Sequence, residues 1–222
     1  MSDDTGPTLP AQRTRGHLID RVVIGVFGNA QHGKDTAAKL IEQSLKDKGK
    51  RAKRLALADP LKEVAQSLLG MPAGIAWGAD DGDISLREQQ RLSWTKYGKN
   101  AREWLQWIGT ELGREQIDDC LWVDRAVDRV VGDEEGTEFF IITDCRFNNE
   151  RITLPLRFRE RFIRFVPLRI YRPCVPVNMM HVSEAEVAAM TADMFASVID
   201  NDSDMDGLRS RVDEFVSNHL FI

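Results

Sequence analysis

Hydrophobic and polar positions follow one another in blocks typical of strands alternating with helices. The unbroken apolar run at 22–27 predicts a buried strand. The segment from about 34 to 48 repeats apolar residues every three or four positions, as in a helix with one buried face. The same patterns recur downstream, and they predict strands at 52–58, 139–143, 163–171 and 196–199 and helices at 60–69, 148–160, 183–193 and around 208–216.

Strands that alternate with helices predict an α/β fold in which a parallel sheet is covered by helices on both faces. Two segments interrupt the alternation. The stretch 70–83 is rich in Gly, Pro and Asp, which predicts a loop, and 84–131 has helical periodicity. Length favours one sizeable domain over 21–222 with 70–131 as a helical insertion, and the polar segment 1–20 predicts a flexible tail.

Composition and net charge limit the kinds of ligand and partner that we expect this protein to bind. The net charge of −5 gives no overall positive field for nucleic acid or an anionic membrane, which favours small molecules. The three cysteines are widely spaced without a CxxC pair, which argues against a disulfide framework or a zinc site. With no signal peptide and no apolar segment of membrane-spanning length, we expect a cytoplasmic protein without membrane contact.

The clearest chemical signal is the loop directly after the first apolar run, with the letters GNAQHGKDT between a predicted strand and a predicted helix. In such a loop the backbone N–H groups turn inward around phosphate oxygens, and a lysine at the first helical turn adds a positive charge. The loop predicts that a nucleoside triphosphate binds to Gly28, Asn29, Ala30, Gln31, His32, Gly33, Lys34, Asp35 and Thr36.

Within the loop, Lys34 is expected to bridge the β- and γ-phosphates and to follow the transferred group. Asp35 stands where Ser or Thr normally supplies a hydroxyl to Mg²⁺. A carboxylate there repels phosphates unless Mg²⁺ lies between them or the side chain turns away, and Thr36 contacts either the α-phosphate or the metal. We interpret His32 as a loop contact rather than an acid or base.

Charged residues also follow other predicted strands. Asp59 comes after the second strand, and Asp144 and Arg146 follow the strand at 139–143. Because parallel strands end at the same edge of a sheet, these side chains are candidates for the site, with Asp144 holding Mg²⁺ or substrate and Arg146 a phosphate. A helix-capping aspartate beside a surface arginine is the alternative interpretation.

Two further groups of polar residues are weaker candidates. Arg102 and Gln106 lie one helical turn apart and suit a monophosphate and a base, although a solvated helix face explains the same spacing. The stretch 144–172 holds eight arginines, three acidic residues and no lysine. Arginines closing over phosphates in a mobile lid account for some of them, in particular Arg172, whereas a solvated surface accounts for the rest.

Six sequence blocks together resemble the bacteriophage deoxynucleoside monophosphate kinases. They are GNAQHGKDT, LADPLKEVA, REWLQWIGTELGRE, ITDCRFNNE, HVSE and VIDND, in this order, and they cover most of 22–216. The Gly-Lys-Asp-Thr ending belongs to that family's pattern, so Asp35 no longer argues against nucleotide binding.

The resemblance implies the three-layer fold of P-loop kinases and transfer of the γ-phosphoryl group of ATP, with Mg²⁺, to a deoxynucleoside monophosphate for viral DNA synthesis in the host cytoplasm. It implies that ATP is held by the phosphate loop and Asn201, with Asp35 and Thr36 near the metal. Lys34, Asp144 and Arg146 are the catalytic candidates. The acceptor candidates, partly within the 70–131 insertion, are Asp59, Lys62, Arg102, Gln106, Arg114, Asp144, Arg146 and Arg172.

Two other functions are compatible with the motifs. One is a P-loop kinase that phosphorylates a hydroxymethylpyrimidine base within phage DNA, the only reading in which nucleic acid is a partner. The other is a nucleotide-binding protein without catalysis. The sequence leaves open the accepted base, the preference for deoxyribose, and whether the chain forms a homodimer.

Overall fold

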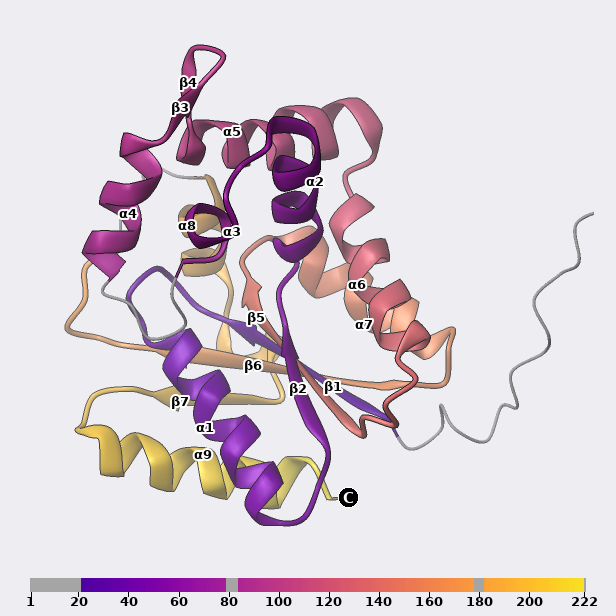
Figure 1. Ribbon diagram of the computed structural model, residues 1–222. Coiled ribbons are helices and arrows are strands. Elements are labelled where there is room, and N and C mark those ends of the chain that lie inside the picture. Colours follow the sequence, from indigo (N-terminus) through magenta and orange to yellow (C-terminus); the bar gives the residue numbers. More distant parts are fainter. Residues whose placement is uncertain (1–20, 79–83, 178–181, 222) are drawn as a thin grey trace, which may run out of the picture.

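A five-stranded sheet, in the order β2-β5-β1-β6-β7 with every adjacent pair parallel, forms the middle layer of the protein (Figure 1). The computed structural model describes residues 21–78, 84–177 and 182–221, so the predicted tail at 1–20 lies outside the described residues. The predicted α/β class with a parallel sheet is confirmed. The strands are β1 (Val22–Phe27), β2 (Ala52–Leu55), β5 (Phe139–Cys145), β6 (Arg164–Tyr171) and β7 (Ser197–Asp200).

Helices cover both faces of this sheet, which completes the three predicted layers. On one face lie α1 (Lys34–Asp47) and α9 (Met205–His219). On the other lie α6 (Leu121–Gly132) and α7 (Asn148–Arg159). All six residues of β1 are buried, and alternate side chains enter opposite cores, which is why this strand is an unbroken apolar run rather than an alternating one.

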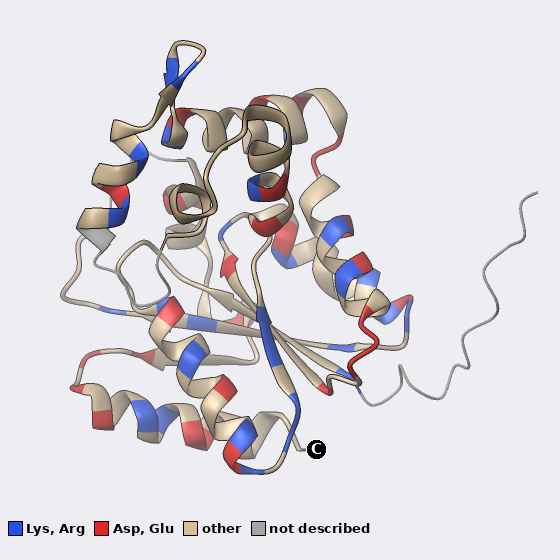
Figure 2. Cartoon of the chain, viewed as in Figure 1, with Lys and Arg blue, Asp and Glu red and all other residues tan. Residues whose placement is uncertain are grey.

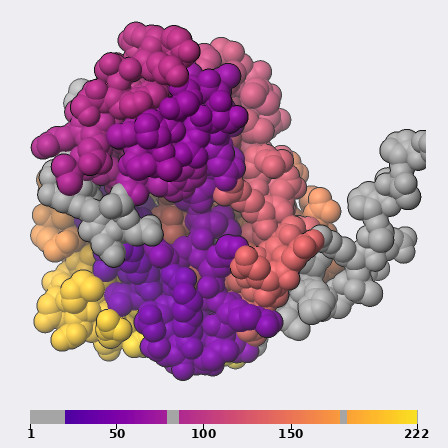
Figure 3. Space-filling model, viewed as in Figure 1, coloured from indigo at the N-terminus to yellow at the C-terminus, as the bar shows by residue number. Residues whose placement is uncertain are grey.

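The segment between β2 and α6 forms a separate cap of short elements, which occupies the upper part of the visible face in Figure 3. Its elements are α2 (Asp59–Leu69), α3 (Ala73–Ala76), α4 (Ile84–Ser93), β3 (Thr95–Lys96), β4 (Lys99–Asn100), α5 (Ala101–Trp107) and the π-helix η2 (Ile108–Ile117).

The prediction that 84–131 is entirely helical is wrong at its centre. An antiparallel hairpin of β3 and β4 separates α4 from α5. Its two turn residues, Tyr97 and Gly98, have φ angles of 52° and 78°, which is the conformation of a tight hairpin turn. Strands of two residues are too short to produce an alternating pattern, so periodicity missed them. The predicted loop at 70–83 likewise contains the single turn α3.

The C-terminal third differs from the prediction in one helix. The helix α8 (Val182–Ala189) ends four residues earlier than expected, and a 3₁₀ turn, η3 (Ala192–Met194), follows it. Ser183 lies inside α8. The carboxylate of Glu186 on the same helix accepts a hydrogen bond from the backbone N–H of Asn148 (2.7 Å).

Both signs of charge are spread over the outer faces of the helices (Figure 2). Arg157 on α7, for example, pairs with Asp124 on α6 (2.8 Å), which agrees with the surface role that the sequence left open for part of the arginine-rich stretch. None of the helices in the described part of the chain is long and apolar enough to cross a membrane.

Candidate functional site

The loop between β1 and α1 has the geometry of an anion cradle. Gly33 has a φ angle of 91°, and a Cβ atom on it would come within 2.5 Å of the Nδ2 atom of Asn201, so only glycine fits. Among the residues that the structure describes, no side chain caps the start of α1. The first N–H groups of a helix lack intrahelical partners, so this helix end offers donors and a positive dipole to an anion.

Lys34 lies within this cradle rather than on the surface. Its side chain is buried, and its Nζ atom donates a hydrogen bond to the carbonyl oxygen of Asn29 (2.7 Å). Burial, together with the positive charge of Arg146, lowers the pKa of Lys34 to about 8, against the opposing effect of Glu184. The loop lysine is therefore held inside the loop with a pKa close to neutral pH.

The second half of the loop is supported from β6 and β7. Asn201 donates from Nδ2 to the carbonyl oxygen of His32 (3.1 Å), and the backbone N–H of Arg172 donates to Nδ1 of His32 (3.3 Å). The His32 ring also packs edge-on against Tyr171. Burial and the neighbouring Lys34 lower the pKa of His32, so the ring is neutral and lies where a loop contact was expected.

The first half of the loop is supported by Glu184 on α8. Asn29 donates from Nδ2 to the carbonyl oxygen (2.8 Å) and to Oε2 (3.0 Å) of Glu184, and the backbone N–H of Ala30 donates to the same Oε2 (2.9 Å). The other carboxylate oxygen, Oε1, lies 3.6 Å from Nη1 of Arg146. Glu184 belongs to the HVSE block of the family resemblance, but it was not among the predicted site residues, because its partners in the loop lie about 155 positions away in the chain.

A cavity of about 310 Å³ opens at the carboxyl end of the sheet, between the cap segment and β5. Four of the predicted acceptor residues line it: Gln106, Arg114, Asp144 and Arg146. Apolar and polar residues that were not predicted as site residues complete the walls, among them Leu57, Leu61, Leu105, Thr110, Trp122 and Glu150.

Asp144 joins two walls of this cavity. Its Oδ1 accepts from the backbone N–H of Leu57 (2.7 Å) and its Oδ2 from that of Ala58 (3.0 Å). These bonds explain why β2 ends at Leu55 and not at residue 58, because the next amides bind a side chain instead of the sheet. The pairing of β5 with β1 shifts register just before Cys145, and such a bulge re-aims the side chains beside it.

The Asp144 carboxylate is partly buried, and desolvation raises its pKa although the two backbone hydrogen bonds oppose the shift. Its two oxygens are thus already engaged in holding the segment between β2 and α2. Asp144 therefore fixes the shape of the cavity wall that it lines.

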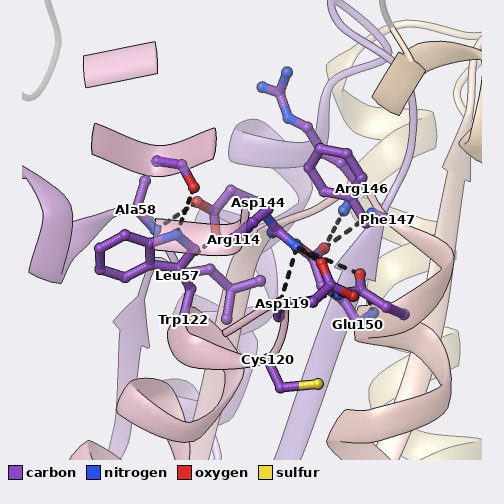
Figure 4. A network of polar contacts seen from close by, with 12 residues as sticks. Leu57, Ala58, Arg114, Asp119, Cys120, Trp122, Asp144, Arg146, Phe147 and Glu150 are labelled. Atoms are coloured by element: carbon purple, nitrogen blue, oxygen red, sulfur yellow. Dashed lines mark hydrogen bonds and ion pairs between the residues drawn. The ribbon is translucent and has the colours of Figure 1, made fainter. Parts of the chain in front are cut away.

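Arg114, Phe147 and Glu150 form a second fixed wall (Figure 4). Glu150 accepts from Arg114 through Oε1 (2.5 Å), and its Oε2 accepts from the backbone N–H groups of Arg146 (2.7 Å) and Phe147 (3.0 Å). The guanidinium carbon of Arg114 lies 4.2 Å from the centre of the Phe147 ring. Glu150 is buried, and burial raises its pKa. The network fixes the side chain of Arg114 and the backbone of Arg146.

The π-helix η2 gives the cavity its floor. Its Gly109 carbonyl accepts from Nε1 of Trp122 (2.8 Å), and the Trp122 ring packs so close to Gly113 that a Cβ there would lie 2.5 Å from the ring. Segments of π-helix are rare and recur at functional sites. The indole and the two glycines hold Thr110 and Arg114 of η2 at the cavity.

Four predicted acceptor residues lie outside the residues that line this cavity. The Asp59 carboxylate accepts from Lys62 (3.1 Å) and lies 3.7 Å from Arg129 on α6. Arg102 pairs with Glu88 on α4 (3.3 Å), and the backbone N–H of Arg172 donates to His32 in the phosphate loop. Ion pairs within the cap and between the cap and α6 therefore hold the side chains of Asp59, Lys62 and Arg102, which sequence position alone had assigned to the acceptor.

The oxygen-bearing side chains near the phosphate loop show whether Mg²⁺ fits this site. No group of three or more His, Cys, Asp or Glu side chains in the described ranges is arranged to hold a metal ion by itself. Asp35 and Thr36 supply two oxygen-bearing side chains at the start of α1. This small set fits Mg²⁺, which is usually held by one or two carboxylates together with substrate phosphates and water.

The fold and the site define a P-loop α/β protein with a polar cavity beside its phosphate loop. The chain is distantly related to the deoxynucleoside-5'-monophosphate kinase of Escherichia phage T5, with 26% identity over 176 residues, covering 58% of this chain and 70% of that protein. This relative confirms the resemblance inferred from the sequence blocks. No protein-family model matches the chain.

Solved structures with a similar arrangement include two kinases. The APS kinase CysC of Mycobacterium tuberculosis in complex with AMPPNP and APS is 13% identical with a TM-score of 0.39, covering 89% of this chain and 98% of that chain. A sugar kinase from Janibacter sp. HTCC2649 is 16% identical with a TM-score of 0.39, covering 90% and 96%.

Proposed function

We propose that this protein is a deoxynucleoside monophosphate kinase that transfers the γ-phosphoryl group of ATP to a deoxynucleoside monophosphate, giving ADP and the diphosphate. One observation carries the proposal: the phosphate loop with Lys34 and the cavity with Arg146 are adjacent, since a single carboxylate, Glu184, contacts both. Two anion-binding sites that meet at one edge of the sheet suit a reaction between two phosphorylated ligands. The phage T5 relative supports the same reaction class.

On the donor side, the loop backbone and the start of α1 bind the triphosphate, and Lys34 leaves the Asn29 carbonyl to contact the phosphates. Asn201 acts by holding the His32 carbonyl and thereby the loop. Asp35 and Thr36 would hold Mg²⁺ together with the phosphates, and the metal would supply charge neutralisation at the transferred group.

On the acceptor side, Arg146 binds the monophosphate, because its guanidinium is 43% exposed and lines the cavity. Arg114 adds positive charge from a fixed position. Gln106 and Thr110 supply hydrogen-bonding groups for a base, and Leu61 and Trp122 supply apolar surface. Several of these residues come from α5 and η2, which supports an acceptor-binding role for the 70–131 insertion.

The reaction needs no protein nucleophile. An oxygen of the acceptor phosphate forms the new bond to the γ-phosphorus while the bond from that phosphorus to the β–γ bridging oxygen breaks, and ADP leaves. Lys34 and Arg146 align the two polyanions and neutralise the charge shared between them, which is the main contribution of proteins to phosphoryl transfer.

The proposal is tested by incubating the protein with labelled ATP and Mg²⁺ and a panel of ordinary and hydroxymethylated monophosphates, with duplex DNA containing hydroxymethylpyrimidine as a parallel substrate. We expect label in a free diphosphate and ADP release that depends on the monophosphate. Label found in DNA alone would favour the DNA kinase, and no transfer to either acceptor would leave a nucleotide-binding protein.

Side-chain variants test the acceptor assignment. Arg146→Ala should raise KM for the monophosphate at least about tenfold, since a charged hydrogen bond of about 1.5–3 kcal/mol is lost, with little change in KM for ATP. Arg125→Ala is the matched control, because Arg125 is an exposed arginine on α6 that pairs with Asp128 (3.1 Å). An equal loss of ATP binding in Arg146→Ala would place Arg146 on the donor side.

A further inference from the structure

Glu184 occupies an unusual position for an acidic residue in a site that binds anions. Its side chain is buried, yet its two oxygens serve different parts of the site. Oε2 accepts from Asn29 and Ala30 of the phosphate loop, and Oε1 faces Arg146 at 3.6 Å. Burial alone would raise its pKa, but the hydrogen bonds from Ala30 and Asn29 and the charge of Arg146 lower it. The buried carboxylate is therefore ionised at neutral pH.

This negative charge lies between two positive ones. The charge of Arg146 disfavours protonation of Lys34, and the charge of Glu184 favours it. Asp35 and Asp144 also favour the protonated lysine. His32, which is neutral, and the buried thiol of Cys145, whose pKa is raised, are also close to Lys34. Without Glu184, the two cations that must approach the same transferred group would repel each other across a buried site.

Arg146 has one anchor for its backbone and another for its side chain. Glu150 accepts from its backbone N–H (2.7 Å), and Glu184 is the ion-pair partner of its guanidinium. The first anchor fixes where the residue lies and the second fixes where the guanidinium points. Truncating Glu184 would thus release the Arg146 side chain without moving its backbone.

We propose that Glu184 is a positioning residue that ties the phosphate loop to Arg146, so that the donor and acceptor halves of the site are aligned before the substrates bind. The proposal rests on the proposed function for its effect on turnover, but the ordering of the Arg146 side chain by Glu184 belongs to the free protein. Glu184 touches no reacting atom and acts through Asn29, Ala30 and Arg146.

The first test measures the order of the Arg146 guanidinium in the free protein by ¹⁵N NMR relaxation of its Nε–H group, with the signal assigned by its loss in Arg146→Lys. We expect Glu184→Gln to lower the order parameter of this group to the flexible range, below about 0.6, because the ion-pair partner of the guanidinium is removed. Glu186→Gln, on the same helix but bound to Asn148, should leave it unchanged.

A second variant keeps the test decisive if Glu184→Gln folds poorly. Glu184→Asp keeps the charge but is one methylene shorter, so it should also release the Arg146 guanidinium. An Arg146 guanidinium that stays as ordered in a folded Glu184→Gln or Glu184→Asp as in the unaltered chain overturns the proposal. Because this measurement uses no substrate, its failure is distinguishable from failure of the proposed function, which the transfer assay reports.

The second test uses turnover in a double-mutant cycle. We expect Glu184→Gln to reduce kcat at least about tenfold with a smaller change in KM for ATP, because misalignment of reacting groups lowers the rate more than it lowers binding. Combined with Arg146→Lys, the loss should be clearly less than the product of the two single losses. Losses that multiply would show that Glu184 does not act through Arg146, and full activity in Glu184→Gln would refute the positioning role.

Discussion

The Nζ atom of Lys34 donates a hydrogen bond to the carbonyl oxygen of Asn29 over 2.7 Å, so the cation of the phosphate loop is folded back onto its own loop. The side-chain amide of Asn29 donates two hydrogen bonds to Glu184, which hold Asn29 in place. Lys34 and the Asn29 carbonyl that accepts its hydrogen bond are thus held in one network. Under the proposed function, a bound triphosphate replaces this carbonyl oxygen with a phosphate oxygen as the acceptor for Lys34. Four predictions follow from this and the neighbouring contacts.

Lys34→Ala should preserve the fold and reduce phosphoryl transfer at least about a hundredfold, because one preorganised donor to developing charge contributes about 10²–10³ in kcat. Steady-state kinetics with circular dichroism would measure both effects. Lys39→Ala, an exposed position on the same helix, is the control and should retain normal rates. Near-normal turnover in Lys34→Ala would show that the loop does not contact the transferred group.

Binding of ATP should weaken as the pH rises through about 8, the pKa of Lys34 in the free protein. Bound phosphate favours the protonated lysine and raises its pKa, so the contribution of Lys34 to affinity is complete below about 8 and is lost as the pH rises from there through the higher pKa of the bound state. Titration calorimetry with a nonhydrolysable ATP analogue from pH 6.5 to 9.5, chosen to span about two units around that pKa, would follow this change. Lys34→Arg should remove the dependence, and an unchanged slope in that variant would assign the titration to another group.

Asp144→Asn should lower the free energy of unfolding by about 1–3 kcal/mol, because the amide group turns a second donor toward one of the two partly buried backbone N–H groups. Urea unfolding would measure it. We also expect a higher KM for the monophosphate, since the cavity wall formed by Leu57 and Ala58 loosens. Asp128→Asn, on the surface of α6, should change stability by less than about 0.5 kcal/mol. Equal stability of the two variants would contradict the bridging role of Asp144.

Gly113→Ala should destabilise the protein by about 1–3 kcal/mol, the usual cost of overpacking a filled core. The new methyl group would meet the Trp122 ring at 2.5 Å, and that ring is held in place by its hydrogen bond to Gly109. Gly132→Ala is a matched control at the end of α6, where a Cβ has open space, and should be neutral or stabilising by about 0.5–1 kcal/mol.

Thermal unfolding of both glycine variants measures the effect of each substitution on stability. Monophosphate binding to the folded variants then measures its effect on the cavity. If η2 forms the cavity floor, Gly113→Ala should also weaken monophosphate binding, whereas Gly132→Ala should not. A Gly113→Ala protein that is as stable as the unaltered chain would mean that Trp122 is free to move and does not fix η2.

The local patterns predicted the elements whose signals are contained within a few residues. The apolar run at 22–27 and the helical periodicity after Lys34 correspond to β1 and α1. The two-residue strands β3 and β4 and the end of β2 could not be predicted in this way. The first are shorter than one period of the pattern, and the second depends on amides being bound by Asp144.

Some residues of the candidate site could likewise be predicted from the sequence, and others could not. Gln106, Arg114, Asp144 and Arg146 were selected from motif and position, and they line one cavity. Arg102 was selected by the same reasoning, but it pairs with Glu88 across the cap. Helical spacing shows which residues share a face, whereas the neighbour of that face depends on how α4 packs against α5.

The sequence by itself determined the phosphate loop, the alternation of strands and helices and the relationship to a phage nucleotide kinase, because each depends on residues that are adjacent in the chain. Only the tertiary structure decided the partners of Glu184, Glu150 and Trp122. Glu184 binds Asn29 across 155 positions of sequence, and Glu150 binds Arg114 across 36. A buried carboxylate is stable only when donors surround it, and those donors come together only when the strands and helices have packed.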